Sequence, residues 1–205
     1  ERHLEILARH GHIIPTASHA SILDEYQARC EADVDAGYGW AVACMEGLAE
    51  SDVIGAAIMA WGAHRHLVPD EIGWLLRWLE VRDIEVWLVS ASNRWAIETG
   101  AAELGVPVDR VIALSVDVDD GVLGGEVHTP LSNGAGKAAL IKSRIGAVPL
   151  LAVGNSQHDM AMLKEADVGV VLRLAGGDGA LPERCPILDQ GAATHGWLQR
   201  DLPAG

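Results

Sequence analysis

The chain has 205 residues, of which 49% are hydrophobic and 21% charged, a composition typical of a globular protein and not of a disordered one. Its formal net charge of −14 disfavours nucleic acid and anionic membranes as partners. No apolar run approaches the ~20 residues that a membrane-spanning helix needs. Cys30, Cys44 and Cys185 show neither metal-ligand spacing nor a pairing pattern. We therefore expect a cytoplasmic protein with reduced cysteines.

The first part of the chain has a helical pattern. Residues 1–68 are rich in alanine, leucine, methionine and glutamate and lack strand-like alternation. Ser21 is expected to cap one helix, and Val68-Pro69-Asp70-Glu71 predicts the start of another. Later segments alternate between strand and helix patterns, which is typical of a parallel sheet. We therefore predict a helical region, residues 1–68, followed by an α/β region, residues 69–205.

A first polar strand end is predicted near residue 90. The apolar stretch from Ile84 to Val89 reads as a buried strand, and a helical pattern follows from Arg94 to Leu104. Between them stand Ser90, Ala91 and Ser92. A serine hydroxyl and backbone N–H groups at a helix start can bind an anion. These three residues are therefore candidates for contact with an anionic group.

A lysine follows a short glycine-rich segment further along the chain. Asn133-Gly-Ala-Gly-Lys137 leads into a predicted helix from Ala138 to Ile145. The Lys137 ammonium is thus placed where it could neutralise the charge of a phosphate. Gly-x-Gly-Lys by itself is a weak signal, so its weight depends on the other segments.

The strongest signal is a third strand end, after residue 153. Leu150 to Val153 reads as a buried parallel strand that stops at Gly154. Asn155 and, four residues later, Asp159 follow at once, with His158 beside the aspartate. The carboxyl edge of an open parallel sheet is where α/β proteins bind ligands, and Mg²⁺ takes oxygen ligands of this kind. Asn155 and Asp159 are therefore candidate metal ligands.

Serine, lysine and an Asn/Asp pair, in this order, resemble motifs II, III and IV of the haloacid dehalogenase-like (HAD) phosphatases. The likeness extends over residues 65 to 175 and is similar in order and spacing to the phosphoserine-phosphatase-like branch. It is carried by the following segments: Val86-Trp-Leu-Val-Ser-Ala-Ser92, Glu103-Leu-Gly-Val106, Asp120-Gly-Val-Leu-Gly-Gly125, Gly136-Lys137 and the residues after Gly154. The resemblance implies an α/β fold, a Rossmann-like parallel sheet forming the HAD core, with residues 1–68 as a helical cap.

The resemblance also implies roles for the candidate residues. Ser90, with Ala91 and Ser92, would bind the phosphoryl group, and Lys137 would stabilise its charge. Asn155 and Asp159 would hold Mg²⁺. His158 is a candidate substrate contact because of its place beside Asp159, and the alternative is that it only begins a helix. The family usually has aspartate where this chain has Asn155, so the metal would meet an uncharged amide oxygen at this position.

Motif I, a strand ending in Asp-x-Asp-Gly-Thr that supplies the nucleophile, is not found before Ser90. Asp33-Val-Asp35 follows a mixed, charged stretch and reads as a helix surface. Asp117-Val-Asp119-Asp-Gly121 ends an apolar run but has one residue too many before the glycine, and we interpret it as a hairpin. The motif I strand lies at the centre of the family's sheet. We therefore expect that the chain omits N-terminal residues of the natural protein, with Asp117 as the less favoured candidate nucleophile.

The sequence thus predicts a magnesium-dependent phosphomonoester hydrolase that acts on a small phosphorylated metabolite through an aspartyl-phosphate intermediate. Two alternatives remain. One is a catalytically dead phosphate-binding protein with the same fold, and the other is a different HAD hydrolase such as a dehalogenase. The substrate stays open between phosphoserine, another small phosphomonoester and a phosphorylated amino alcohol.

Overall fold

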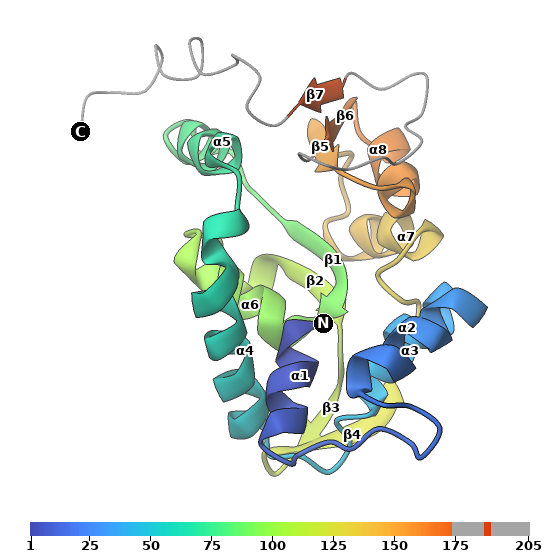
Figure 1. Ribbon diagram of the computed structural model, residues 1–205. Coiled ribbons are helices and arrows are strands. Elements are labelled where there is room, and N and C mark those ends of the chain that lie inside the picture. Colours follow the sequence, from blue (N-terminus) through green and yellow to red (C-terminus); the bar gives the residue numbers. More distant parts are fainter. Residues whose placement is uncertain (174–186, 190–205) are drawn as a thin grey trace. The chain divides into compact units, whose positions relative to one another are not determined.

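The computed structural model describes residues 1–173 and 187–189 (Figure 1). Cys185 lies outside these ranges, while Cys30 and Cys44 are free thiols. The chain divides into two compact units. Unit 1 consists of Glu1–Arg65 and Leu88–Leu131, and unit 2 of His66–Trp87 and Ser132–Gly205. The predicted division of the chain into residues 1–68 and 69–205 stays a prediction.

The regular elements before residue 68 are helices, as the sequence predicts. They are α1 (Arg2–Arg9), α2 (Ile22–Ala32), α3 (Val34–Ala43), α4 (Glu50–His64) and the short 3₁₀ helix η1 (Arg65–Leu67). Polar side chains begin two of them. Ser21 Oγ accepts a hydrogen bond from the backbone N–H of Asp24, 3.1 Å away, and Asp33 accepts one from Ala36 at the same distance. The predicted cap at Ser21 is confirmed, because its hydroxyl satisfies a backbone donor that the first helical turn leaves open.

The rest of unit 1 is a small α/β arrangement. It contains β1 (Leu88–Asn93), α6 (Arg94–Glu103), the 3₁₀ helix η2 (Val108–Arg110), β2 (Val111–Leu114), β3 (Val116–Asp119) and β4 (Val122–Val127). Strand β1 pairs in parallel with β2, with α6 as the connection between them. Strands β3 and β4 form an antiparallel hairpin whose turn residues, Asp120 and Gly121, have φ of 48° and 78°. Positive φ at both positions suits a tight hairpin, so the predicted hairpin is confirmed.

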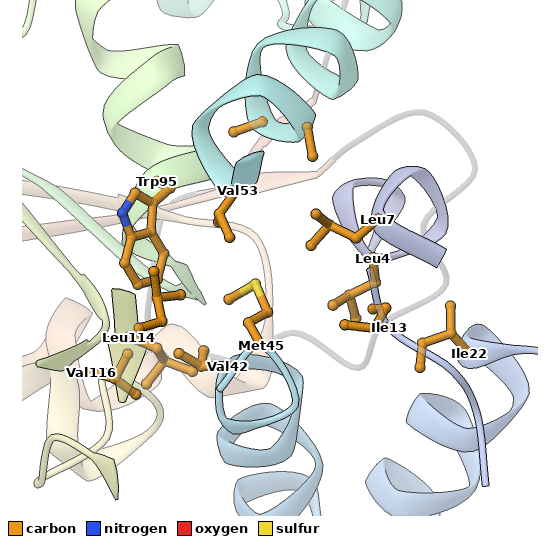
Figure 2. Close-up of a cluster of buried hydrophobic side chains, with 13 residues drawn as sticks. Leu4, Leu7, Ile13, Ile22, Val42, Met45, Val53, Trp95, Leu114 and Val116 are labelled. Atoms are coloured by element: carbon orange, nitrogen blue, oxygen red, sulfur yellow. The ribbon is translucent and has the colours of Figure 1, made fainter. Parts of the chain in front are cut away.

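One apolar core holds unit 1 together (Figure 2). Helix α1 contributes Leu4 and Leu7, α4 contributes Val53, and Trp95 comes from α6; all four are at most 2% exposed. Burying a side chain of this size contributes about 1.5–3 kcal/mol. The core therefore fixes the helices of residues 1–65 to the strands that follow residue 88.

Unit 2 carries a parallel sheet. Its elements are α5 (Asp70–Glu80), α7 (Ala135–Arg144), β5 (Leu151–Gly154), the 3₁₀ helix η3 (Gln157–Asp159), α8 (Met160–Glu165), β6 (Val168–Arg173) and β7 (Ile187–Asp189). The strand order is β5-β6-β7, with both pairs parallel. Helix α8 connects β5 to β6, and its Met162 and Leu163 are buried. The predicted α/β class with parallel strands is confirmed.

Two sequence-predicted boundaries were wrong. The strand expected at Ile84–Val89 runs from Leu88 to Asn93, so Ser90 lies within β1 and not after it. The cause is the partner strand, because pairing begins where Leu88 meets Val111. The helix expected from Ala138 begins at Ala135, which places Lys137 in its first turn. Among the described residues, no helix has the length and apolar character needed to cross a membrane.

Candidate active site

The loop after β5 is organised by one carboxylate. Asp159, at the end of η3, turns back so that its Oδ2 accepts hydrogen bonds from the backbone N–H of Asn155 and of Ser156, each at 3.0 Å. The Ser156 hydroxyl donates a third hydrogen bond to the same oxygen, also at 3.0 Å. The side chain four residues beyond the strand end thereby fixes the conformation of the loop that leaves the strand.

The other oxygen of Asp159 pairs with Lys137. Lys137 Nζ lies 2.6 Å from Asp159 Oδ1, and both side chains are only 7% exposed. Lys137 comes from the first turn of α7, which packs against α8. An ammonium at this distance forms a charge-assisted hydrogen bond, stronger than a neutral one. The pair therefore joins two separate segments, the glycine-rich turn before α7 and the loop after β5.

The pKa of Asp159 reports the balance of these forces. Burial raises the pKa of the carboxyl, but the hydrogen bond and charge of Lys137 and the donors of Asn155 and Ser156 together hold it below its ordinary value. Hydrogen bonds to the charged form outweigh desolvation here. Asp159 is thus an ionised group in a largely buried place at neutral pH.

Gly154 makes the close approach of Asp159 possible. A Cβ atom at Gly154 would lie 2.5 Å from Asp159 Cβ and 3.0 Å from its Oδ2. Such a contact is too short for any side chain, so the strand must end in glycine for the carboxylate to fold back over it. The glycine at the strand end thus has a physical reason in the geometry of the loop.

Asn155 and His158 have different surroundings in this loop. Asn155 is exposed, and its described contact is the backbone N–H bond to Asp159. His158 is half-buried within η3. The structure therefore places Lys137, Asn155, His158 and Asp159 in one part of unit 2. Ser156 belongs to the same loop and is a residue that the sequence reasoning did not assign.

The donors of this loop fit Mg²⁺ by type. Asn155 offers an amide oxygen and Asp159 a carboxylate oxygen, and a magnesium ion is commonly bound through one or two carboxylates plus waters and substrate phosphate. The described residues hold no cluster of three or more His, Cys, Asp and Glu side chains. Because Lys137 already balances the one carboxylate, a phosphate group would have to supply much of the remaining negative charge.

Ser90, Ala91 and Ser92 belong to unit 1 and lie on β1. The backbone N–H of Ser92 donates to Ser90 Oγ, 3.1 Å away. The helix that follows is capped by Asn93, whose Oδ1 accepts from the backbone N–H of Ala96 at 2.9 Å. The helix predicted from Arg94 is confirmed, because α6 begins at that residue, four positions after Ser90. The sequence reasoning did not assign the cap, although asparagine just before a helical pattern is a typical cap signal.

A cavity of about 220 Å³ in unit 1 opens beside these serines. Ser90 to Asn93 form one wall, and residues of α1, α2 and α3 form the others. Two of its lining residues are in contact, because Asn93 Nδ2 donates to His3 Nε2, 2.6 Å away. Burial lowers the pKa of His3 to about 3, so the ring is neutral and can accept this hydrogen bond. The sequence reasoning did not find His3, because 90 residues separate it from Asn93.

Asp117 has none of the features of a shielded nucleophile. Its side chain is 93% exposed on β3 of the hairpin and pairs with His128 Nε2 at 2.9 Å. Asp159, by contrast, has a side chain that is only 7% exposed and is held by Lys137, Asn155 and Ser156. Asp117 is therefore a weaker candidate in the structure than the apolar run before it suggests.

Comparisons with known proteins identify the family of the chain. The family model described as HAD, haloacid dehalogenase-like hydrolase, matches residues 13–164. No curated protein sequence matches the chain. A HAD family hydrolase from Salmonella enterica serovar Typhi has a similar structure, with 14% identity, a TM-score of 0.60, and coverage of 93% of this chain and 63% of its own. This chain therefore spans less than two thirds of the length of that hydrolase.

Two further solved structures share the fold. A substrate-bound phosphoserine phosphatase is 19% identical with a TM-score of 0.53, over 84% of this chain and 79% of its own. A phosphoserine phosphohydrolase-like protein from Francisella tularensis is 15% identical with a TM-score of 0.50, over 74% of this chain and 76% of its own. At these identities the likeness is one of fold. Because the family model covers most of the sequence, the chain belongs to the haloacid dehalogenase-like hydrolase family.

Proposed function

We propose that the protein is a magnesium-dependent phosphomonoester hydrolase that acts on a small phosphorylated metabolite in the cytoplasm. The observation that supports this most is the buried pair of Lys137 and Asp159, 2.6 Å apart at the end of β5. A desolvated ammonium that is held in place before the substrate binds can stabilise the charge of a transferring phosphoryl group without reorganising. The fold shared with a phosphoserine phosphatase supports the same reaction class.

Each candidate residue has a role in this proposal. Lys137 would stabilise charge on the phosphoryl group, and Asp159 would hold the Lys137 ammonium and the loop backbone in place. Asn155 and Asp159 would hold Mg²⁺, which supplies charge stabilisation at the phosphoryl oxygens. Ser90, with the backbone of Ala91 and Ser92, would donate hydrogen bonds to the phosphoryl group.

The nucleophile of the proposed reaction is an aspartate that forms an aspartyl-phosphate, which water then hydrolyses. We propose that this aspartate is not Asp117, in line with the family resemblance, which places the nucleophile in motif I. The exposure of the Asp117 side chain, 93%, supports this choice. Asp117→Asn tests this choice, because activity that survives this substitution requires another nucleophile.

The test is phosphate release from an aryl phosphate, with and without Mg²⁺. We expect turnover that chelator abolishes, in this chain or in one that carries the upstream strand. Lys137→Ala should reduce it by about a hundredfold, the scale of losing one preorganised charge. Lys142→Ala is the matched control, because Lys142 is an exposed lysine of the same helix and should leave turnover within twofold.

Other outcomes would identify the alternatives. Binding of phosphate without turnover, even with the upstream strand present, would indicate a catalytically dead phosphate-binding protein. Release of halide from a haloacid, without hydrolysis of phosphate esters, would indicate a dehalogenase. Equal losses in Lys137→Ala and Lys142→Ala would show that the buried pair has no special part in the reaction.

Magnesium affinity provides a second test, at Asn155. Asn155→Asp adds a negative charge at an exposed position of the loop and should lower the Mg²⁺ concentration needed for half-maximal activity. Gln157→Glu, two residues away and also exposed, adds the same charge without a ligand position and controls for the general field. The same shift in both variants, or none in either, would remove Asn155 from the metal site.

A further inference from the structure

The cavity beside Ser90 has a size that suits a small group. Its volume of about 220 Å³ lies below the ~300–1,000 Å³ typical of pockets for drug-sized ligands. Ser90 stands on its wall, and the proposed function places a phosphoryl group at Ser90. A group attached to that phosphate would therefore extend into the cavity, between β1 and the helices of residues 1–65.

Two tyrosines are among the residues that the helices contribute to the lining, beside the aliphatic Leu4, Ala41 and Val42. Tyr26 of α2 and Tyr38 of α3 both line the cavity, and their rings are stacked with centroids 6.4 Å apart and an interplanar angle of 16°. The electron-rich faces of tyrosines attract cations and pack well against methylene groups. Such a wall favours an ammonium or alkyl group over an anion.

The lining lacks the residues that hold carboxylates. Within the described chain, no lysine or arginine borders the cavity, although arginine is the usual partner of a carboxylate. Three arginines lie near lining residues in sequence, and all three are paired elsewhere. Arg2, which stands between Glu1 and His3, pairs with Glu5 at 2.6 Å. Arg29 pairs with Glu25 at 2.7 Å and lies over the ring of Trp40, and Arg94 pairs with Glu50 at 2.9 Å.

The other ionisable groups at the cavity provide no cationic side chain either. His3 is held as a neutral acceptor by its contact with Asn93. Glu1, which also lines the cavity, is an acidic residue and adds no cationic side chain. A carboxylate that entered the cavity would thus lose its water and meet no cationic side chain, which is costly.

We infer that this cavity binds the alcohol portion of the substrate and selects a phosphorylated amino alcohol over a phosphorylated hydroxy acid or amino acid, an inference that rests on the proposed function. Tyr38 would be a specificity-determining residue through its ring face. The ammonium would lie against the tyrosine rings, while the phosphate stays at Ser90. Phosphoserine would be a poor substrate, because its carboxylate has no cationic partner in the lining.

Phosphoethanolamine and phosphoserine test the inference, because they differ by a single carboxylate. Their affinities for the chain, measured by calorimetry with Mg²⁺ present, read the preference whether or not turnover occurs. We expect phosphoethanolamine to bind at least about tenfold more tightly. Equal affinities, tighter binding of phosphoserine, or no binding of either ester would overturn the inference.

Variants at Tyr38 locate the preference. Tyr38→Leu should weaken phosphoethanolamine binding by about tenfold, a loss within the range for one cation–π contact, whereas Tyr38→Phe keeps the ring and should keep the affinity. Equal affinities in the two variants would remove the ring from the site. Aryl phosphate hydrolysis tests the proposed function separately from the cavity inference. Turnover combined with a preference for phosphoserine would refute the cavity inference alone. Absence of turnover, even with the upstream strand present, would refute the proposed function.

Discussion

Replacing Lys137 by methionine removes the ammonium and keeps most of the side chain's volume. The partner left behind is Asp159, with 7% of its side chain exposed. Breaking a buried ion pair by removing one member costs about 3–5 kcal/mol, because an uncompensated charge remains inside. Three donors still reach Asp159 Oδ2 from Asn155 and Ser156, so we expect a loss near the lower end, about 3 kcal/mol.

The double variant Lys137→Met/Asp159→Asn isolates the interaction. With both charges removed, no unpaired charge is buried, so the double variant should be more stable than the sum of the two single losses by more than 1 kcal/mol. Unfolding in urea at pH 7, followed by circular dichroism, gives the four free energies. A loss below about 1 kcal/mol in Lys137→Met, or additive losses, would refute the view that this pair organises the loop.

The stability of the wild type and that of Lys137→Met should change in opposite directions with pH. In the wild type the pKa of Asp159 is lowered, so its contribution to stability is present above the unfolded value of about 3.9 and is lost as pH falls through the folded pKa. In Lys137→Met the lysine no longer lowers the pKa of Asp159, so the effect of burial prevails and this pKa rises. The variant's deficit should therefore be larger at pH 7.5 than at pH 5.

Three further predictions concern packing and burial. Gly154→Ala should cost about 1–3 kcal/mol and reduce activity, since its Cβ would lie 2.5 Å from Asp159 Cβ; unchanged urea unfolding and turnover would contradict this. Gly100→Ala should cost a similar amount through its 2.9 Å approach to the Trp61 ring, with activity per folded molecule retained. The pKa of His3 is about 3 when folded and 6.5 when unfolded, so stability should fall as pH drops from 6.5 toward 3, by at most about 1.4 kcal/mol per pH unit. His3→Gln should flatten this slope, and an unchanged slope would contradict the burial of the ring.

The elements of the fold could largely be predicted, because they depend on local patterns. The apolar run before Gly154, the cap at Ser21 and the helix beginning at Asp70 follow from residue types at fixed spacing. The limits of β1 could not be predicted in the same way. Ile84 to Trp87 have strand-like residues, but a strand exists only where a partner supplies hydrogen bonds, and β2 begins at the level of Leu88.

The residues of the candidate site could be predicted from the sequence, but the contacts between them could not. Asp159 follows a strand end and Lys137 begins a helix, which are local signals. Their contact joins residues 22 apart, and the contact of His3 with Asn93 joins residues 90 apart. Both depend on how elements pack. Sequence spacing also gave no indication that Asp159 would bind its own loop through one oxygen and the lysine through the other.

The central claim is that Lys137 and the loop after β5 form a site for phosphate and Mg²⁺. The most direct test follows the backbone amide resonances of Asn155 and Ser156 by NMR during titration with Mg²⁺ in the presence of inorganic phosphate, which needs no nucleophile. The account predicts saturable shifts at these two amides that require both ions and disappear in Lys137→Met. Shifts confined to other parts of the chain, or unchanged binding in the variant, would contradict it.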